Sequence, residues 1–241
     1  MARSWVVFCA ALLGCGRTRF DPVTDGADGF VGCTHTFCDD FDRPAPVETG
    51  WTSATVTGGL LSLDSTTSVS SPSSLRVDLT STATGSALLE QTFAPTAITS
   101  VHYAFDLAIE TADSTAELDL AQMKWLTVQA PCTGLGFYIV RTRAFSPPKL
   151  VMQETYSGCG GNTDDILPFT TGFHHIDVLV LTGAANVAHL TVTVDDALAV
   201  DRPVPVPVPA SRVQLDLGAP AIQAVNASWV IHYDNVAVDL Q

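Results

Sequence analysis

The chain has 241 residues, a length that suits a single all-β domain, and only 15% of its residues are charged. Its 25 acidic side chains outnumber its 11 basic ones, so the formal net charge is −14. This charge repels phosphate-rich partners and argues against binding to nucleic acid, whereas neutral glycans, calcium and basic surfaces remain acceptable partners.

Residues 1–14 have the pattern of an export signal, with Arg3 ahead of an apolar run that is too short to span a bilayer. The sequence LLGC that ends at Cys15 resembles the lipobox of bacterial lipoproteins. This resemblance implies cleavage before Cys15 and acylation of that cysteine. The chain would then be anchored at the bacterial cell envelope, on the outer membrane or the cell surface. The alternative is an ordinary signal peptide that is cleaved elsewhere.

Four cysteines remain beyond the signal and the acylated position: Cys33, Cys38, Cys132 and Cys159. An even number of cysteines in an oxidising compartment predicts two disulfides. We expect Cys33 to pair with Cys38 and Cys132 with Cys159, since each pair closes a turn-rich stretch, although four cysteines allow three connectivities. A zinc site is a weaker alternative, because the sequence contains no CxxC pair.

Residues 15–35 combine Asp, Gly and isolated apolar residues without a period, which predicts a flexible, acylated tether. The aspartates in this stretch do not have the spacing of an EF-hand loop. The folded domain is therefore expected to span residues 36–241.

Beyond the tether, short segments alternate between apolar and polar residues with a period of two. Examples are SLRVDL (74–79), VHYAFDLAI (101–109) and RVQLDL (212–217), each of which places its apolar residues on one face. No segment has the pattern of an amphipathic helix. The sequence therefore predicts an all-β protein with little helix, a two-sheet antiparallel β-sandwich of the jelly-roll type.

Three features mark the C-terminal part of the chain. The segment LTVTVDDALAV (190–200) predicts a hairpin that turns at Asp195 and Asp196. The prolines of PVPVPVP (203–209) lack backbone donors, so this stretch is expected at a sheet edge or in a connection, or as a peptide for a proline-reading partner. The segment 229–240 predicts a long closing strand.

Three segments together resemble the concanavalin A-like lectin and glucanase superfamily, which includes laminin G-like jelly rolls. They are FCDDFDRP followed by SSPSSLRV, the hairpin followed by RVQLDLG, and the closing WVIHYDNVAV; together they cover roughly residues 36–241. The resemblance implies that the first and last strands pair. Asp40 and Asp42 would then lie near Asp234 and Asn235.

The segment AELDLAQM (116–123) resembles the E-x-D-x-x-E strand of the glucanase branch, in which two glutamates act as nucleophile and acid/base. Glu117 and Asp119 match, but the third carboxylate is replaced by Gln122, or by Ala121 if the strand has no bulge. A retaining glycosidase needs two carboxyl groups about 5–5.5 Å apart, so an amide at this place argues against hydrolysis. An ordinary polar strand face explains the same residues.

A protein that binds a sugar without catalysing a reaction needs aromatic rings that stack on a pyranose and polar groups that bind its hydroxyls. The candidate ligand-binding residues on neighbouring predicted strands are Glu117, Asp119, Gln122, Trp125, Tyr138, Arg141 and Glu154. For each ring the alternative is a place in the core, where strand aromatics usually lie.

Near the chain ends, Asp40, Asp42, Asp234 and Asn235 supply the hard oxygen ligands that calcium prefers. A structural calcium ion is the one cofactor that the sequence suggests. An acidic turn beside a terminal strand explains these residues without an ion.

From these patterns we predict a membrane-anchored surface lipoprotein that presents a lectin-like, carbohydrate-binding sandwich without catalytic activity. Its partners would be a glycan or polysaccharide and, through the lipid, the membrane. One alternative is a glycoside hydrolase or polysaccharide lyase that uses Glu117 with a partner such as Glu154 or Asp177. The other is a structural module for protein interactions in the cell envelope.

Overall fold

The computed structural model describes residues 33–80, 85–94, 98–111, 118–126, 135–143, 149–155, 163–168, 170–183, 187–205, 212–222 and 228–241. The predicted signal, the lipidation site at Cys15, most of the tether, Glu117, Cys132 and Cys159 lie outside the described residues. So do the side chains of Tyr138 and Arg141, whose backbone is described.

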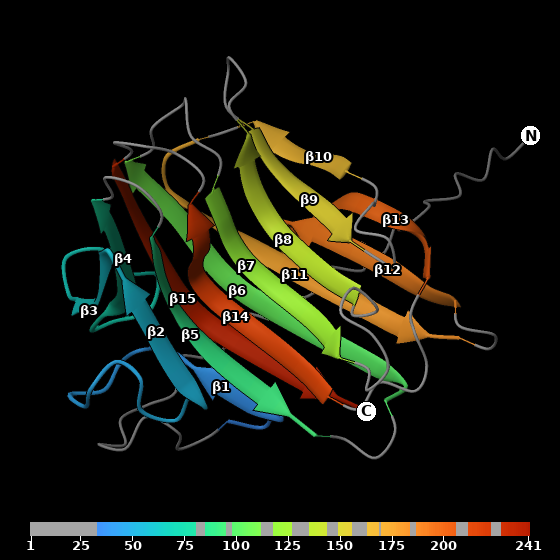
Figure 1. Ribbon diagram of the computed structural model, residues 1–241, viewed down its shortest axis with the longest axis horizontal. Helices are drawn as coiled ribbons and strands as arrows, with labels where there is room; N and C mark the ends of the chain where they lie inside the picture. Colours follow the sequence, from blue (N-terminus) through green and yellow to red (C-terminus); the bar gives the residue numbers. More distant parts are fainter. Residues whose placement is uncertain are drawn as a thin grey trace, which may run out of the picture.

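Two antiparallel sheets form a β-sandwich, which confirms the predicted fold class (Figure 1). The seven-stranded sheet contains β2 (Ser53–Thr57), β5 (Ser86–Phe93), β7 (Leu118–Leu126), β8 (Leu135–Arg143), β9 (Lys149–Thr155), β10 (Thr163–Pro168) and β14 (Arg212–Ile222). The eight-stranded sheet contains β1 (Phe37–Asp39), β3 (Gly59–Asp64), β4 (Ser74–Thr80), β6 (Ser100–Thr111), β11 (Phe173–Thr182), β12 (Val187–Val194), β13 (Ala197–Pro205) and β15 (Ser228–Leu240).

The spatial order of the strands differs from their order along the chain. The seven-stranded sheet runs β10-β9-β8-β7-β14-β5-β2 and lies in front in Figure 1. The eight-stranded sheet runs β13-β12-β11-β6-β15-β4-β3 behind it, and β1 pairs with β15. None of the described residues belongs to a helix with the length and apolar character needed to span a bilayer.

The core lies between the sheets and is built by the predicted alternation. The inward side chains of β4, β6 and β14 are at most 2% exposed; they are Leu75, Val77, Leu79, Val101, Tyr103, Phe105, Leu107, Ile109, Val213, Leu215 and Leu217. Burying one Val, Leu, Ile or Phe side chain stabilises a fold by about 1.5–3 kcal/mol. The opposite faces of the same strands lie away from this core and carry polar side chains.

The two ends of the domain are joined, as the resemblance implied. In β1, Phe37 pairs with Val238 of β15. The predicted disulfide is confirmed, and it joins Cys38 within β1 to Cys33 ahead of the strand. The resemblance implies the strand pairing, whereas the short turn-rich stretch between the two cysteines predicts the disulfide. Pairing the first strand with the last brings the N-terminal strand against the centre of the eight-stranded sheet.

The predicted hairpin is confirmed between β12 and β13. Asp195 and Asp196 form its turn and both have positive φ angles, 50° and 66°. This is the backbone of a type I′ turn, whose twist matches that of the flanking strands. Pro203 and Pro205 lie in β13, an edge strand of its sheet, so the edge placement of the start of the proline tract is confirmed.

Candidate functional site

The outer face of the seven-stranded sheet carries polar side chains across its central strands. In β14, Gln214 and Asp216 flank the buried Leu215, so both point away from the core. The strand register places Asp216 opposite Gln122 of β7 and opposite Glu90 of β5. Paired residues in a sheet share a face, so these groups form one transverse row.

Five of these residues form a hydrogen-bonded group that we name the central polar cluster: Lys124, Asp216, Gln214, Glu90 and Thr92. Lys124 forms an ion pair with Asp216. The amide nitrogen of Gln214 donates to Asp216 (2.9 Å) and to Glu90 (2.8 Å), and the hydroxyl of Thr92 donates to Glu90 (3.2 Å). The side chain of Asp216 is 2% exposed and that of Lys124 is 29% exposed, so a ligand can reach the ammonium group.

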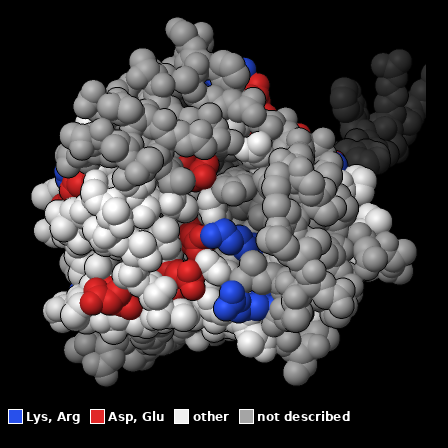
Figure 2. All heavy atoms as spheres, viewed as in Figure 1, with Lys and Arg blue, Asp and Glu red and all other residues white. Residues whose placement is uncertain are grey.

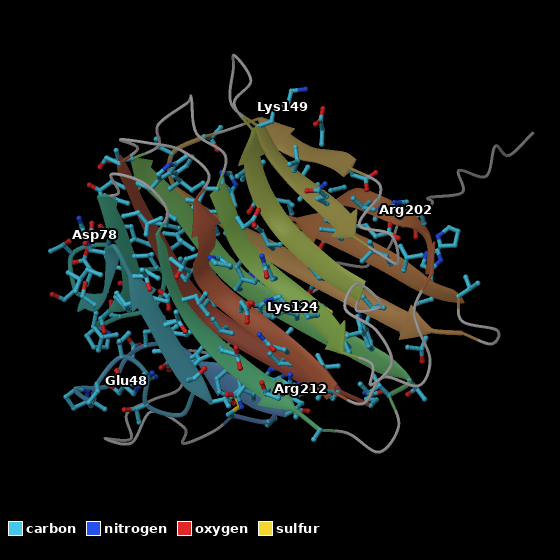
Figure 3. All side chains as sticks on the ribbon, viewed as in Figure 1. Glu48, Asp78, Lys124, Lys149, Arg202 and Arg212 are labelled. Carbon is cyan, nitrogen blue, oxygen red and sulfur yellow. A yellow bond between two sulfur atoms is a disulfide. The ribbon has the colours of Figure 1, made fainter. Side chains whose placement is uncertain are left out.

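Basic and acidic side chains meet in the middle of this face (Figure 2). In Figure 3, Lys124 lies over the central strands, and Arg212 lies nearer the end at which β14 begins. The sequence has only one other lysine, Lys149, which forms an exposed ion pair with Asp165 (2.7 Å) at the β9–β10 side of the sheet. Lys124 is thus the lysine that the fold places at the centre of the sheet.

Asp119 lies beside Gln122, whose amide nitrogen is 3.4 Å from the carboxylate. A regular strand places residues i and i+3 on opposite faces, so β7 is irregular here. Ala121 is buried in the core, which leaves Gln122 in the place of the third carboxylate of the glucanase-like pattern. Burial raises the pKa of Asp119 to about 6, although the hydrogen bond from Gln122 and the charge of Lys124 act in the opposite direction.

The neighbouring strand is irregular at the same level. The register of β14 against β7 shifts between Leu217 and Ala221, and Gly218 in this stretch has a φ of +122°. A Cβ atom on Gly218 would lie 2.5 Å from the carbonyl oxygen of Ala87, so no larger residue fits without a backbone shift.

The prediction that Trp125 binds a ligand is wrong. Its side chain is 1% exposed and belongs to the core, as does that of Met123. Both residues lie on the face of β7 that packs against the eight-stranded sheet. The ring therefore contributes buried apolar area and is closed to a sugar.

The prediction that Glu154 binds a ligand is also wrong. Its side chain is fully buried and forms an ion pair with Arg202 of β13, which also binds Asp164 of β10 (2.8 Å). These contacts join the two sheets, because a buried carboxylate needs a charged partner. Asp177, the other suggested partner for Glu117, lies in the eight-stranded sheet, 2.8 Å from His102. Neither carboxylate can act with β7.

Two further candidates are placed by their backbone. The register sets Tyr138 of β8 opposite Gln122 and Arg141 opposite Asp119. The central strands thus bring four of the predicted site residues together: Asp119, Gln122, Tyr138 and Arg141. Glu117 directly precedes β7 and lies outside the described residues.

Sequence reasoning missed the central polar cluster. A signal for it was present, since Lys124 is one of two lysines in the chain and lies directly between the apolar residues Met123 and Trp125. Its partner Asp216 is 92 residues away, beyond the reach of any local pattern.

The four candidate calcium ligands each make other contacts. Asp234 accepts hydrogen bonds from the backbone N–H groups of residues 69–70 (2.7 and 2.9 Å), and Asp42 accepts one from the backbone just before β4 (2.7 Å). Asn235 donates to the carboxylate of Asp106 (2.7 Å), and Asp40 accepts a hydrogen bond from the backbone N–H of Asp42 (3.1 Å). Within the described ranges, no group of three or more His, Cys, Asp or Glu side chains is arranged to hold a metal ion. Calcium stays a prediction from the sequence.

No protein-family model and no curated protein matches the chain. Among solved structures, it is similar to the endo-beta-1,4-glucuronan lyase from the fungus Trichoderma reesei, with a TM-score of 0.64 and 15% identity over 86% of this chain and 96% of that one. It is also similar to the alginate lyase Aly36B, with a TM-score of 0.53 and 16% identity over 70% of this chain and 81% of that one. A mutant of Aly36B in complex with alginate tetrasaccharide has a TM-score of 0.54 and 14% identity, with 69% and 80% covered.

Identities this low show a shared fold, the jelly-roll β-sandwich. The comparisons also correct the leading prediction from the sequence, that of a sugar-binding protein without catalytic activity. The three similar structures named above are polysaccharide lyases, so they favour the enzymatic alternative over a non-catalytic, lectin-like lipoprotein.

Proposed function

We propose that this chain is a polysaccharide lyase that binds and cleaves an acidic glycan on the outer face of its seven-stranded sheet. The observation that carries the proposal is Lys124, a solvent-reachable cation that Asp216 holds over the central strands of the sheet. The fold shared with a glucuronan lyase and an alginate lyase supports it. Because one fold serves many activities, the activity depends on the residues of the face.

Lyase chemistry on a uronate glycan is a β-elimination. A base removes the proton on the carbon next to the carboxylate, the electron pair forms a carbon–carbon double bond, and the glycosidic oxygen leaves with a proton. Negative charge builds up on the uronate carboxylate as the proton departs, so a fixed cation there lowers the barrier. The site therefore needs a cation or strong donor, a proton acceptor and a proton donor.

The outer face offers a group for each task. In our proposal the ammonium of Lys124 and the amide of Gln122 bind the uronate carboxylate. Asp119, whose carboxyl has a pKa of about 6, is close to the protonation equilibrium that a general base or acid needs. Tyr138, whose backbone lies opposite Gln122 in the register, is our candidate for the donor of a proton to the leaving oxygen, because a phenol can donate one.

The masses of the reaction products test the proposal. The full chain is incubated with glucuronan and with alginate, and the oligosaccharides are analysed by mass spectrometry. Elimination leaves an unsaturated sugar at one new end, so each such product is lighter by one water than the product of hydrolysis. Products with hydrolytic masses, or no cleavage of any acidic glycan by the folded protein, would contradict the proposal.

We also propose that the chain acts outside the cytoplasm, at the cell envelope. The support is the export pattern of residues 1–14 and the lipobox-like sequence at Cys15. Labelling cells with a fatty-acid analogue tests the anchor, and Cys15→Ser is expected to abolish the label. A label that persists in this variant would contradict acylation at Cys15.

A further inference from the structure

The two halves of the seven-stranded sheet differ in their basic residues. Residues 53–57 and 81–97, which contain β2 and β5, include one charged residue, Glu90, and no lysine or arginine. On the other side, β7 and β8 contain Lys124, Arg141 and Arg143. A glycan lying across the strands therefore passes from a region with basic residues to one without them.

Glu90 is held in place at the border between these halves. Its two carboxylate oxygens accept hydrogen bonds from Gln214 (2.8 Å) and Thr92 (3.2 Å). Gln214 is fixed in turn by Asp216, the partner of Lys124. The carboxylate of Glu90 thus belongs to the same hydrogen-bonded group as the ammonium of Lys124.

The spacing of strands makes Glu90 relevant to a bound glycan. Glu90 on β5 is two strands from β7, or about 10 Å, because neighbouring strands lie about 4.8 Å apart. A carboxylate bound over β5 would lie well within the screening length of about 8–10 Å from Glu90, so the two anions would repel each other. A hydroxyl group at the same place can donate a hydrogen bond to Glu90 instead.

We propose that the substrate is an acidic heteroglycan, with a uronate over β7 and β8 and uncharged sugars over β5 and β2. This inference rests on the proposed function and specifies its substrate. The uronate carboxylate meets Lys124, and the hydroxyls of the uncharged sugars meet Glu90 and the exposed Ser and Thr side chains of β2. A polymer made only of uronates places a carboxylate beside Glu90, so it is the poorer substrate.

The kinetic test compares two polymers and two variants of the full chain. The polymers are a homopolymer of uronate and a glycan in which uronates alternate with uncharged sugars, and the measured quantity is kcat/KM for each. The wild type is expected to prefer the alternating glycan, and Glu90→Gln is expected to reduce this preference by about tenfold, because it removes a like-charge contact. Glu48→Gln is the matched control, since Glu48 is exposed in the segment before β2 (Figure 3) and should leave the preference unchanged. A preference for the homopolymer, or one that Glu90→Gln does not alter, overturns the inference.

A binding experiment separates this inference from the proposed function. The two lysines are methylated with a ¹³C label, so each gives its own NMR signal, and oligosaccharides of both kinds are added. The signal of Lys124 is expected to shift at lower concentrations of the alternating oligosaccharide, while that of Lys149 stays in place. If the Lys124 signal shifts in this way but no glycan is cleaved, the proposed lyase activity is refuted and the proposed preference for the alternating glycan stands. Equal binding of both oligosaccharides, or binding of neither, would refute the preference whether or not cleavage occurs.

Discussion

The hydroxyl of Tyr233 crosses the core from β15 and lies 2.6 Å from the carbonyl oxygen of Leu120 in β7. It also lies 2.8 Å from the carbonyl oxygen of Gly218 in β14. Both carbonyls belong to the irregular stretches of the strands that carry Asp119 and Asp216. The eight-stranded sheet thus supports the candidate site from behind.

Tyr233→Phe removes this hydroxyl, whose single proton is shared by the two buried carbonyl oxygens. We expect the free energy of unfolding to fall by about 1–3 kcal/mol, measured by urea denaturation. Tyr103→Phe is the matched control, because Tyr103 is equally buried but its hydroxyl has no hydrogen-bond partner among the described residues. If both variants lost the same stability, the contacts of Tyr233 would not have the assigned role.

Glu154→Gln tests whether Glu154 serves the structure rather than the ligand. Arg202 loses the charge of its fully buried partner but keeps its ion pair with Asp164, so we expect a loss of about 1–3 kcal/mol. Denaturation should show this loss, while the activity of the folded fraction stays at the wild-type level. Asp165→Asn, which breaks the exposed pair with Lys149, should change stability by less than about 1 kcal/mol. Lost activity at unchanged stability would return Glu154 to the site.

The free energy of unfolding is expected to depend on pH through the histidines. Each of the six histidines contacts a carboxylate on or beside the eight-stranded sheet; the pairs are His35–Asp239, His102–Asp177, His174–Asp195, His175–Asp106, His189–Asp201 and His232–Glu110. The hydrogen bond to Asp177 raises the pKa of His102, and the hydrogen bond to Asp106 raises the pKa of His175. The folded protein therefore binds protons more tightly than the unfolded chain at these sites.

The sign of the pH effect follows from these shifts. The stabilisation by His102 and His175 is complete below the unfolded pKa of about 6.5 and is lost as the pH rises through the folded values. The raised pKa of Asp119 likewise makes the folded protein more stable at low pH. This stabilisation is lost as the pH rises from about 4 to about 6. We expect a larger free energy of unfolding at about pH 6 than at about pH 8, and a smaller difference in the double variant His102→Gln, His175→Gln. Greater stability at the higher pH would contradict these assignments.

The dependence of KM on salt tests how an acidic protein binds an acidic glycan. The net charge of −14 repels the substrate at long range, whereas the contact with Lys124 is local. Added salt shortens the screening length from about 30 Å at 0.01 M to about 10 Å at 0.1 M, so it weakens the long-range repulsion most. KM for the acidic glycan should fall over this range of salt. A rise in KM would mean that attraction by local cations dominates.

The fold could be predicted from the sequence because alternation is a local property. The faces of β4, β6 and β14, and the turn at Asp195, follow from residues that are neighbours in the chain. In β7 the same reasoning failed at Trp125. Leu118 and Leu120 suggest one buried face, whereas Met123 and Trp125 suggest the other, and all four are buried because the strand is irregular between them.

The central polar cluster could not be predicted because its partners come from strands far apart in the chain. Glu90 and Gln214 are 124 residues apart, and Lys124 and Asp216 are 92 residues apart. Only the strand order, with β14 inserted between β7 and β5, brings them together. The pair of Glu154 with Arg202 depends on packing between the sheets in the same way.

The most direct test of the account is the rate of cleavage by Lys124→Ala and Lys149→Ala, which remove the only two lysines of the chain one at a time. The rate is followed by the ultraviolet absorbance of the unsaturated uronate ends that elimination creates. We predict that Lys149→Ala cleaves the acidic glycan at the wild-type rate and that Lys124→Ala, folded as judged by circular dichroism, loses at least about a hundredfold in kcat, as expected when a group that stabilises developing charge is removed. Cleavage by Lys124→Ala at the wild-type rate would contradict the assignment of the site to the outer face of the seven-stranded sheet.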